Sequence, residues 1–496
     1  MKIGRRSKRS FFKTSIMGRM LGDLVHRGRR EQAKHAGAQA ARKLRRPAFS
    51  LEPVEPRLLM SADISYTPSG VTNTLNVSAS FASGNYFLDI TGNVAPPVHQ
   101  QLSAAGDVNI NITPLGGTIA GAGLADTIHF NLDTFSALNN FVTGNGGLLT
   151  LDYAGGLEAL QDDHIFVDGS AANVGYSLKL HTSADITVGA TATFTGDLTL
   201  SSDDSITGNA STHLSAQNLT LQSAPVTNGG AVPSTGILAN ANSTITLTDS
   251  HLTASKTLTL DSHAKVTVDN DGKAVSGVTG AVITSFSNAK IDIGGTAVLQ
   301  AKDVSITSFV EDSLKASADK NTVKLLAVVG GAAPEVTING TAQLTATNNL
   351  TATAKSDVTI DASAKPDATA TNAKADAAIV NTTFNSGASL SIAGSANLTA
   401  TGSATLASSS KLVASTVADA NVPSTAGAAV AVSVITGDTM ASVDSATVHG
   451  ASVALTASSD RTITTAAKSS PGGSQANGGK NKSETTLANN KASTSQ

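Results

Sequence analysis

A short cassette recurs along the chain at a spacing of roughly 45–55 residues, and it constrains the fold more than any other feature. Its clearest copies are residues 293–299 (IGGTAVL), 338–344 (INGTAQL) and 392–398 (IAGSANL), and a looser copy spans residues 443–448. Each copy is followed by a β-type triplet or its remnant, as at Val304-Ser305-Ile306. Because a fixed period of this size is typical of stacked repeats, we expect a solenoid.

Short triplets indicate what the repeating unit is made of. In Leu198-Thr199-Leu200, Leu258-Thr259-Leu260 and Val336-Thr337-Ile338, one hydroxyl residue stands between two apolar residues. This period of two places apolar side chains inward and Thr or Ser outward on a strand. Two-residue hairpin signals are sparse, which disfavours an antiparallel sandwich. The sequence therefore predicts an all-β fold, a parallel β-helix (β-solenoid).

The stretches between cassettes set the expected size of each coil. Residues 323–329 and 428–435 are apolar, and their Val and Ile content favours strand over helix. We expect each unit to supply two coils of about 20–27 residues built from very short strands. About 400 residues would then form a rod on the order of 75–95 Å long, at ~4.8 Å per stacked strand.

Composition agrees with a narrow, one-dimensional core. Aromatic residues make up 3% of the chain, charged residues 14%, and Cys is absent. Small side chains cannot fill a thick globular core at this length, but they can fill the interior of a solenoid. The absence of Cys excludes a disulfide scaffold and thiolate metal sites.

The charge is divided sharply along the chain. Residues 1–57 hold 16 Lys and Arg against 4 Asp and Glu, whereas the remainder holds 18 basic and 33 acidic residues. We predict that residues 1–47 are a basic leader, helical or disordered, which contacts membrane or export machinery rather than nucleic acid. No apolar run in it has the length of a cleavable signal, and we expect no transmembrane segment anywhere.

Residues 48–63 carry the one specific motif. Glu55, Pro56 and Arg57 are followed by one residue, by the apolar pair Leu59 and Met60, and then by Ser61-Ala62-Asp63. This string resembles the LEPR-XLL motif of very long, repetitive bacterial surface or secreted proteins, with Val54 and Met60 in place of two Leu residues. The resemblance implies an adhesin-like protein and carries over no catalytic residue.

The rest of the chain divides by composition. Residues 64–190 hold all four Tyr residues, and we expect them to form a wider first coil or an N-terminal capping and entry β region. Residues 191–466 form the repetitive β-solenoid. Residues 467–496 are polar, and we expect a disordered tail and a reading frame that continues beyond Gln496.

Two acidic clusters are candidates for metal sites. Asp162-Asp163-His164 with Asp168 flanks a short strand, and polar strand ends explain these residues better than a metal does. Asp269-Asn270-Asp271-Gly272 lacks the carboxylates that an EF-hand needs at its first and last positions, so it indicates a turn. The remaining His residues stand apart in the sequence without metal-ligand spacing. We therefore predict no catalytic, cofactor-binding or metal-binding residues and no cofactor.

Three functions remain, and we expect the first. It is a secreted or cell-surface bacterial adhesin whose long Thr-, Ser- and Asn-rich face binds glycans, extracellular matrix or other cells through multivalency. The alternative is a passive stalk or biofilm-matrix spacer. The third is a polysaccharide-active β-helix enzyme, which is disfavoured because such sites combine clustered acids with Arg or Lys and no Arg occurs between residues 58 and 460.

Overall fold

A computed structural model describes residues 61–66, 74–92, 97–102, 108–114, 127–144, 147–153, 164–229, 234–275, 278–321, 323–365, 375–421 and 426–469. The chain divides into two units, Met1–Arg57 and Leu58–Gln496, and every described residue belongs to the second. The predicted leader and tail lie outside the described residues.

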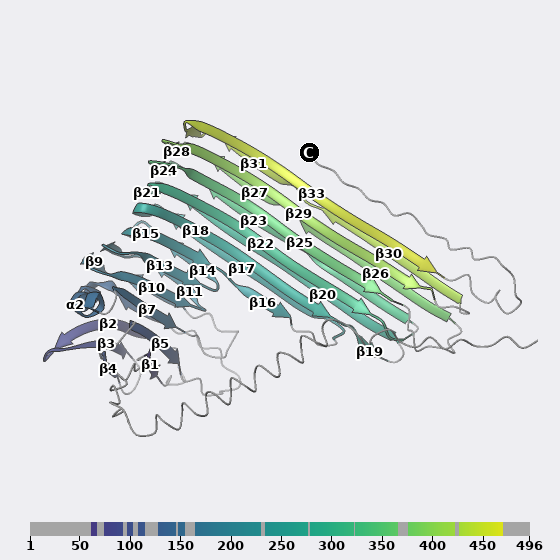
Figure 1. Cartoon of the computed structure of the whole chain (residues 1–496), viewed down its shortest axis with the longest axis horizontal. Helices are drawn as coiled ribbons and strands as arrows, with labels where there is room; N and C mark the ends of the chain where they lie inside the picture. The colour runs from purple at the N-terminus through teal and green to yellow at the C-terminus, as the bar shows by residue number, and fades with distance from the viewer. Residues whose placement is uncertain are drawn as a thin grey trace, which may run out of the picture. The chain divides into compact units, whose positions relative to one another are not determined.

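Two β-sheets make up nearly all of the described chain (Figure 1). The first sheet has 18 strands: β1 (Ser61–Tyr66), β5 (Val108–Pro114), β7 (Leu148–Tyr153), β9 (Ser170–Val174), β10 (Ser177–Thr182), β12 (Thr191–Phe194), β13 (Leu198–Ser202), β15 (His213–Ser223), β16 (Val226–Gly229), β18 (His251–Asn270), β21 (Val298–Ala301), β22 (Asp303–Ala318), β24 (Gln343–Ala346), β25 (Leu350–Ala364), β28 (Asn397–Ala400), β29 (Ser403–Ala420), β32 (Thr447–His449) and β33 (Ser452–Ser469).

The second sheet has 15 strands: β2 (Thr74–Ala82), β3 (Asn85–Gly92), β4 (Val98–Leu102), β6 (Thr127–Asn131), β8 (His164–Asp168), β11 (Asp185–Val188), β14 (Ser205–Gly208), β17 (Ile237–Thr248), β19 (Lys273–Val275), β20 (Val278–Gly294), β23 (Val323–Ile338), β26 (Ala375–Ser386), β27 (Ala388–Ala393), β30 (Ala426–Thr436) and β31 (Thr439–Asp444). A 3₁₀ helix, η1 (Leu132–Leu138), leads into the short helix α2 (Asn139–Gly144).

The chain alternates between the two sheets, and apart from β3, β4 and β19 its strands pair in parallel with their equivalents in the neighbouring coils. The all-β, solenoid-like architecture expected from the sequence is therefore confirmed. In the second sheet Ile293 lies opposite Ile338, Ile338 opposite Ile392, and Ile392 opposite Val443. These four residues are the first residues of successive cassettes. Each cassette therefore corresponds to one coil.

The prediction of two coils per unit is wrong. A unit of about 50 residues makes a single wide coil, because the apolar stretches between cassettes continue the same strands instead of starting a new coil. β22, β23 and β25 have 16, 16 and 15 residues, so the expectation of very short strands fails here too. Strands as short as expected occur in the narrow coils, as in β11 and β14 with 4 residues each, and just after the cassette turns of the wide coils, as in β21 and β24 with 4 residues each.

The expected rod is also too long. Successive parallel partners in the first sheet lead from β1 through β5, β7, β10, β13, β15, β18, β22, β25 and β29 to β33. At ~4.8 Å per strand, these ten steps span about 48 Å. The stack is shorter than expected because each coil contains more residues, so fewer coils are formed.

The cassette glycine is the turn from the second sheet to the first. Gly295, Gly340 and Gly394 have φ values of 64°, 70° and 72°, in the left-handed region that glycine adopts without strain. A Cβ atom at Gly340 would also lie 2.6 Å from the carbonyl oxygen of Gly295 in the coil before. The same turn backbone is hydrogen-bonded between coils, since the Thr341 N–H donates to the Gly295 carbonyl over 2.8 Å. The glycine is thus required by both conformation and stacking.

A column of buried hydroxyl groups explains how narrow coils become wide ones. Ser202 ends a short strand at a turn, and the residues in register with it in the next strands are Ser223, Ser262 and Ser308. In the wide coils these serines lie in mid-strand, and the Ser308 hydroxyl donates to the Ala289 carbonyl of the opposite sheet over 2.7 Å. The same register position therefore ends a strand at a turn in the narrow coils. In the wide coils its hydroxyl forms a hydrogen bond to the opposite sheet.

This hydroxyl column lies between two separate apolar cores. Ile306 belongs to the core that also fills the narrow coils, whereas Val310, four residues later and beyond Ser308, belongs to a second core found only in the wide coils. The second core is built largely from Ala and Val, in keeping with the composition of the long stretches between cassettes.

The narrow end is closed differently from the rest. β2, β3 and β4 pair antiparallel and extend the second sheet beyond β6. Large buried side chains, including Phe130, Phe135, Tyr153 and Tyr176, fill these coils. The region predicted as an entry or cap therefore holds the bulkiest core, but its coils are narrower, not wider, than those that follow.

Candidate interaction surface

The residues of the LEPR-XLL-like motif are only partly described. Glu55, Pro56, Arg57, Leu59 and Met60 lie outside the described residues. Residues 61–63 form the start of β1, where Ser61, Ala62 and Asp63 pair in parallel with Asn109, Ile110 and Asn111 of β5. The end of the motif thus begins the first strand of the first sheet.

The residues of the Asp162–His164 and Asp168 cluster lie apart in the fold. His164 Nδ1 lies 2.8 Å from a carboxylate oxygen of Asp185, one coil later, and Asp168 pairs instead with His129 at 2.6 Å. Asp162 and Asp163 lie outside the described residues. The structure therefore distributes these residues over two cross-strand pairs, in agreement with the interpretation as polar strand ends.

His181 lies between two aspartate side chains. Asp203 is 3.5 Å from its Nε2, and Asp152 is 2.9 Å from its Nδ1. Hydrogen bonds and charges from Asp203 and Asp152 raise the pKa of His181 to about 9, against the opposing effect of burial. Sequence reasoning missed this trio, because its members lie one narrow coil apart and only the register shows that they meet. No group of three or more His, Asp or Glu side chains suited to a metal ion occurs among the described residues.

The predicted turn at residues 269–272 is shorter than expected, because Asp269 and Asn270 end β18 and only Asp271 and Gly272 connect it to β19. Asn270 is buried and its side-chain oxygen accepts from the Gly272 N–H over 3.0 Å. Asp269 binds the Lys315 ammonium at 2.8 Å, and Asp271 accepts from the Ser317 hydroxyl at 2.9 Å. Its acidic groups are therefore engaged with the next coil.

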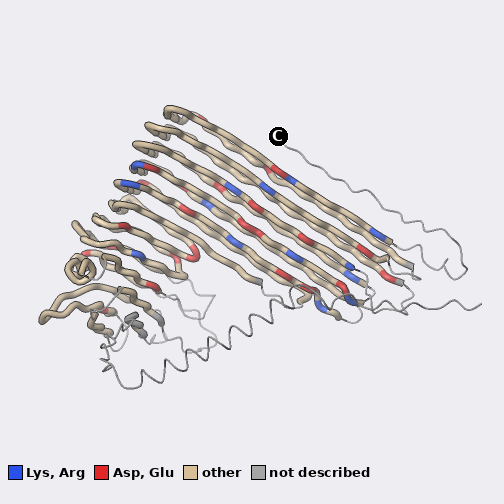
Figure 2. The backbone as a smooth tube through the Cα atoms, viewed as in Figure 1, with Lys and Arg blue, Asp and Glu red and all other residues tan. Residues whose placement is uncertain are grey.

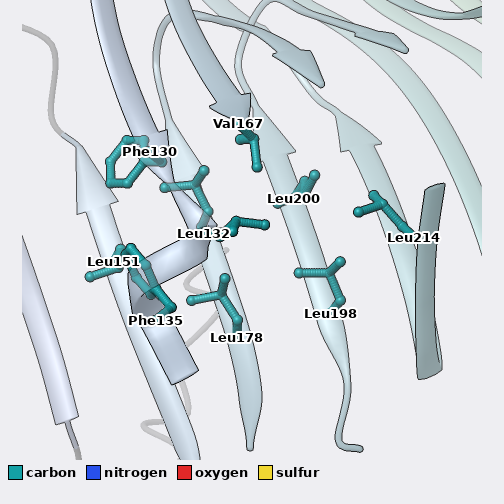
Figure 3. A pocket seen from close by; sticks show the side chains of 10 residues that line it. Phe130, Leu132, Phe135, Leu151, Val167, Leu178, Leu198, Leu200 and Leu214 are labelled. Atoms are coloured by element: carbon teal, nitrogen blue, oxygen red, sulfur yellow. The ribbon is translucent and has the colours of Figure 1, made fainter. Parts of the chain in front are cut away.

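An internal cavity lies at the narrow end between η1 and the first short strands (Figure 3). Its lining is entirely apolar: Phe130, Leu132, Phe135, Leu151, Val167, Leu178, Leu180, Leu198, Leu200 and Leu214. The lining has no polar group that could orient a substrate. We interpret the cavity as a packing defect between large side chains.

The outer face of the first sheet is polar and charged. Lys265, Glu311, Asp357 and Lys411 occupy one register position on successive coils. Lys265 lies 2.8 Å from Glu311, and Lys411 lies 3.6 Å from Asp357. In Figure 2, basic and acidic positions recur on successive long strands of the stack. A second column is hydroxylic, with Thr259, Ser305, Thr351 and Thr405 in register. This face is a regular array of solvated groups.

The outer face of the second sheet is different over the wide coils. The outward residues within 278–288, 323–333, 377–385 and 427–436 include no Asp, Glu, Lys or Arg. Large apolar side chains are exposed on all four strands: Val282, Phe286, Leu325, Ile379, Val430, Val432 and Val434. We call these seven residues the apolar face.

The members of the apolar face lie side by side across coils. Leu325 is opposite Ile379, and Ile379 is opposite Val430, with exposed fractions of 44%, 48% and 50%. Contiguous apolar surface of this kind is rare on a soluble monomer without a binding role. The signal was present in the sequence at residues 428–435, where apolar residues occupy both alternating positions, so that one set must point outward.

No family model, no curated protein and no solved structure matches the chain. Within the described ranges, no helix has the length and apolar character needed to cross a bilayer.

Proposed function

We propose that this protein is a structural, adhesin-like repeat protein of the bacterial surface or exterior that binds through the apolar face of its wide coils. The observation that carries the proposal is the contrast between the two sheets. One outer face carries paired charges and hydroxyl groups, whereas the other presents uncharged apolar side chains on four neighbouring strands.

Repetition gives this face a physical mechanism. Each coil contributes one to three exposed apolar side chains, and a single such contact is weak. Contacts on successive coils form together, since the strands fix their spacing, and avidity then raises the affinity for an extended partner. Glycan chains, matrix proteins and other cell surfaces are extended partners of this kind. The proposal assigns no catalytic step to the chain.

The test uses the full 496-residue chain immobilised on beads and offered panels of glycans, matrix proteins and cells. The triple variant Leu325→Thr, Ile379→Thr, Val430→Thr keeps β-forming side chains and adds no charge. We expect it to lose at least about tenfold in binding. The matched control, Ser305→Thr, Thr351→Ser, Thr405→Ser, changes the hydroxyl column of the opposite face and is expected to bind as the wild type does.

The alternative function is a passive stalk or biofilm-matrix spacer. It predicts that neither the wild-type chain nor any variant binds a member of the panels, and that result would replace the adhesin proposal. Equal losses in both triple variants would place binding elsewhere than on the apolar face.

A further inference from the structure

The fold brings two exposed histidines together on neighbouring coils. His213 is the first residue of β15, and His251 is the first residue of β18. These strands pair in parallel with His213 directly opposite His251. The centroids of the two imidazole rings are 4.6 Å apart, and the ring planes are inclined by 35°. Because the two residues lie far apart in the sequence, only the register of the strands shows that they meet.

This pair differs from the other histidines on the surface of the stack. Most of those lie against a carboxylate of a neighbouring strand: His99, His129, His164, His181 and His263. Within the described ranges, neither His213 nor His251 has such a carboxylate partner or a side-chain hydrogen bond. Their ring nitrogens are therefore available to a ligand from solution.

The backbone beneath the two rings is already fixed by the solenoid. The N–H groups of His213 and His251 donate to carbonyl groups of the coil before, over 2.8 Å and 2.7 Å. The next residues, Leu214 and Leu252, are buried in the core, so the alternation of the strand directs both histidines outward. Only side-chain torsions remain to be ordered when a ligand binds, which keeps the entropic cost of binding low.

The spacing of the two rings suits a single metal ion. Imidazole is a good ligand for divalent zinc, nickel and copper. Zn–N bonds of about 2.0–2.1 Å place two ligating nitrogens roughly 3–3.5 Å apart. Rings whose centroids are 4.6 Å apart reach this separation by rotating about their side-chain torsions, a fast motion for exposed residues.

We propose that His213 and His251 form a two-histidine binding site for a divalent transition metal such as Zn²⁺. Water fills the remaining coordination positions, since no group of three or more suitable His, Asp or Glu side chains occurs in the described part of the chain. The two rings act as one chelate, because the strands hold the second ligand close to an ion that the first has bound. The bound ion joins β15 to β18, where the strand length rises from 11 to 20 residues.

Calorimetric titration of the 496-residue chain with Zn²⁺ tests the proposal. His213→Phe and His251→Phe each keep an aromatic ring at a strand position but remove the ligating nitrogens. Each single variant is expected to bind Zn²⁺ at this site at least about tenfold more weakly than the wild type. The double variant should lose little more than either single variant, because one remaining imidazole no longer chelates.

His449→Phe is the matched control. His449 is also an exposed histidine of the first sheet, but it lies in register with Thr399 and not with a second histidine. This variant should bind Zn²⁺ as the wild type does. The double variant leaves the apolar face unchanged and should keep the binding proposed for that face, so that the two proposals fail or succeed independently.

Electron paramagnetic resonance with Cu²⁺ gives a second readout. At one equivalent of Cu²⁺, the wild type should show hyperfine coupling to two imidazole nitrogens, and the double variant should lose this signal. Coupling to a single nitrogen in the wild type would contradict a shared ion.

Three results of the titration would overturn the proposal. The first is a wild type that does not bind Zn²⁺, and the second is a double variant or a His449 control that differs from these expectations. The third is a pair of single variants that each bind fewer ions with unchanged affinity, which would show two independent histidines.

Discussion

At the scale of single residues, the interior of the wide coils contains charges that a solenoid core would not need. Lys324 and Asp376 form a fully buried ion pair, with Nζ 2.9 Å from the carboxylate. Asp312 is also buried, and only its Oδ1 has a partner, the Ser287 hydroxyl at 2.7 Å. Buried charges are costly unless they are paired or neutral. Lys324 and Asp376 are paired with each other, whereas Asp312 has no cationic partner among the described contacts of its carboxylate.

The first prediction concerns Asp312. Burial raises the pKa of its carboxyl from 3.8 to about 7, with a smaller contribution from the nearby Glu311 charge and an opposing one from the Ser287 hydrogen bond. The folded chain therefore holds a proton between about pH 4 and pH 7 that the unfolded chain releases. Stability should fall as the pH rises through this window and stay lower above it, by about 4 kcal/mol for the whole shift.

The measurement is denaturant unfolding of the wild type and of Asp312→Asn across this pH range. The variant should lose this fall in the free energy of unfolding and should be the more stable protein at pH 8. Asp361→Asn is the control, because Asp361 lies on the outer face of the neighbouring strand β25. Parallel pH profiles for the wild type and Asp312→Asn would show that Asp312 is not the source.

At the scale of elements, coil width depends on the serine column. Ser308 is fully buried, donates to the Ala289 carbonyl over 2.7 Å and accepts from the Glu335 N–H over 3.1 Å. The Ser308 hydroxyl therefore hydrogen-bonds to backbone groups of both β20 and β23. These groups lie at the boundary between the two apolar cores. Ala354 interrupts the column in the next coil, and Ser408 resumes it.

The second prediction follows from this bridge. Ser308→Ala leaves a buried carbonyl and an N–H group without their partner, which should lower the free energy of unfolding by about 1–3 kcal/mol. Ser305→Ala, three residues earlier and pointing outward, should change it by no more than about 0.5 kcal/mol. Thermal or denaturant unfolding of the two variants compares them directly, and equal effects would exclude the bridge as a stabilising element.

Some features of these elements could be predicted from the sequence and others could not. The cassettes at 293–299, 338–344 and 392–398 predict stacked parallel strands, because Gly, hydroxyl and apolar residues recur in the positions that a turn and a following strand need. Coil width was not predictable from the same pattern. In residues 323–329 and 428–435, apolar residues occur at both odd and even positions. The alternation of apolar and polar residues that would show which side of the strand is buried is therefore missing.

The candidate surface was predictable to a lesser extent. The His–Asp pairs and the apolar face depend on which residues lie opposite one another in neighbouring coils, and a sequence without its register does not contain that information. Ser308 shows the same limit, since it resembles the outward-facing hydroxyls of the triplets and differs from them only by its parity along the strand.

At the scale of the whole described stack, the coils become wider along the chain (Figure 1). The strands lengthen from 4 residues in β11 to 20 in β18 and 15 in β25. The narrow end is filled by aromatic side chains and extended by antiparallel strands, whereas the described part of the wide end finishes with β33, which pairs in parallel with β29. The two outer faces also differ: that of the first sheet is polar and charged, and that of the second sheet is apolar over the wide coils. The proposed adhesin-like function uses the apolar face.

The central claim is that each cassette makes one coil, and a disulfide tests it most directly. Thr351 and Thr405 are opposite one another on β25 and β29 although they are separated by one full repeat, and both point outward. Neighbouring parallel strands bring Cα atoms within the range that a disulfide spans. In this chain without Cys, Thr351→Cys with Thr405→Cys should therefore crosslink on oxidation.

The contrasting pair is Thr351→Cys with Ala377→Cys. Ala377 follows Thr351 by about half a repeat, the spacing at which two narrow coils per unit would stack. In the structure Ala377 lies in β26 of the opposite sheet, so this pair should stay reduced. Crosslinking of 351 with 405 alone is the predicted result. Crosslinking of 351 with 377, and not with 405, would contradict the one-coil repeat and every surface inferred from it.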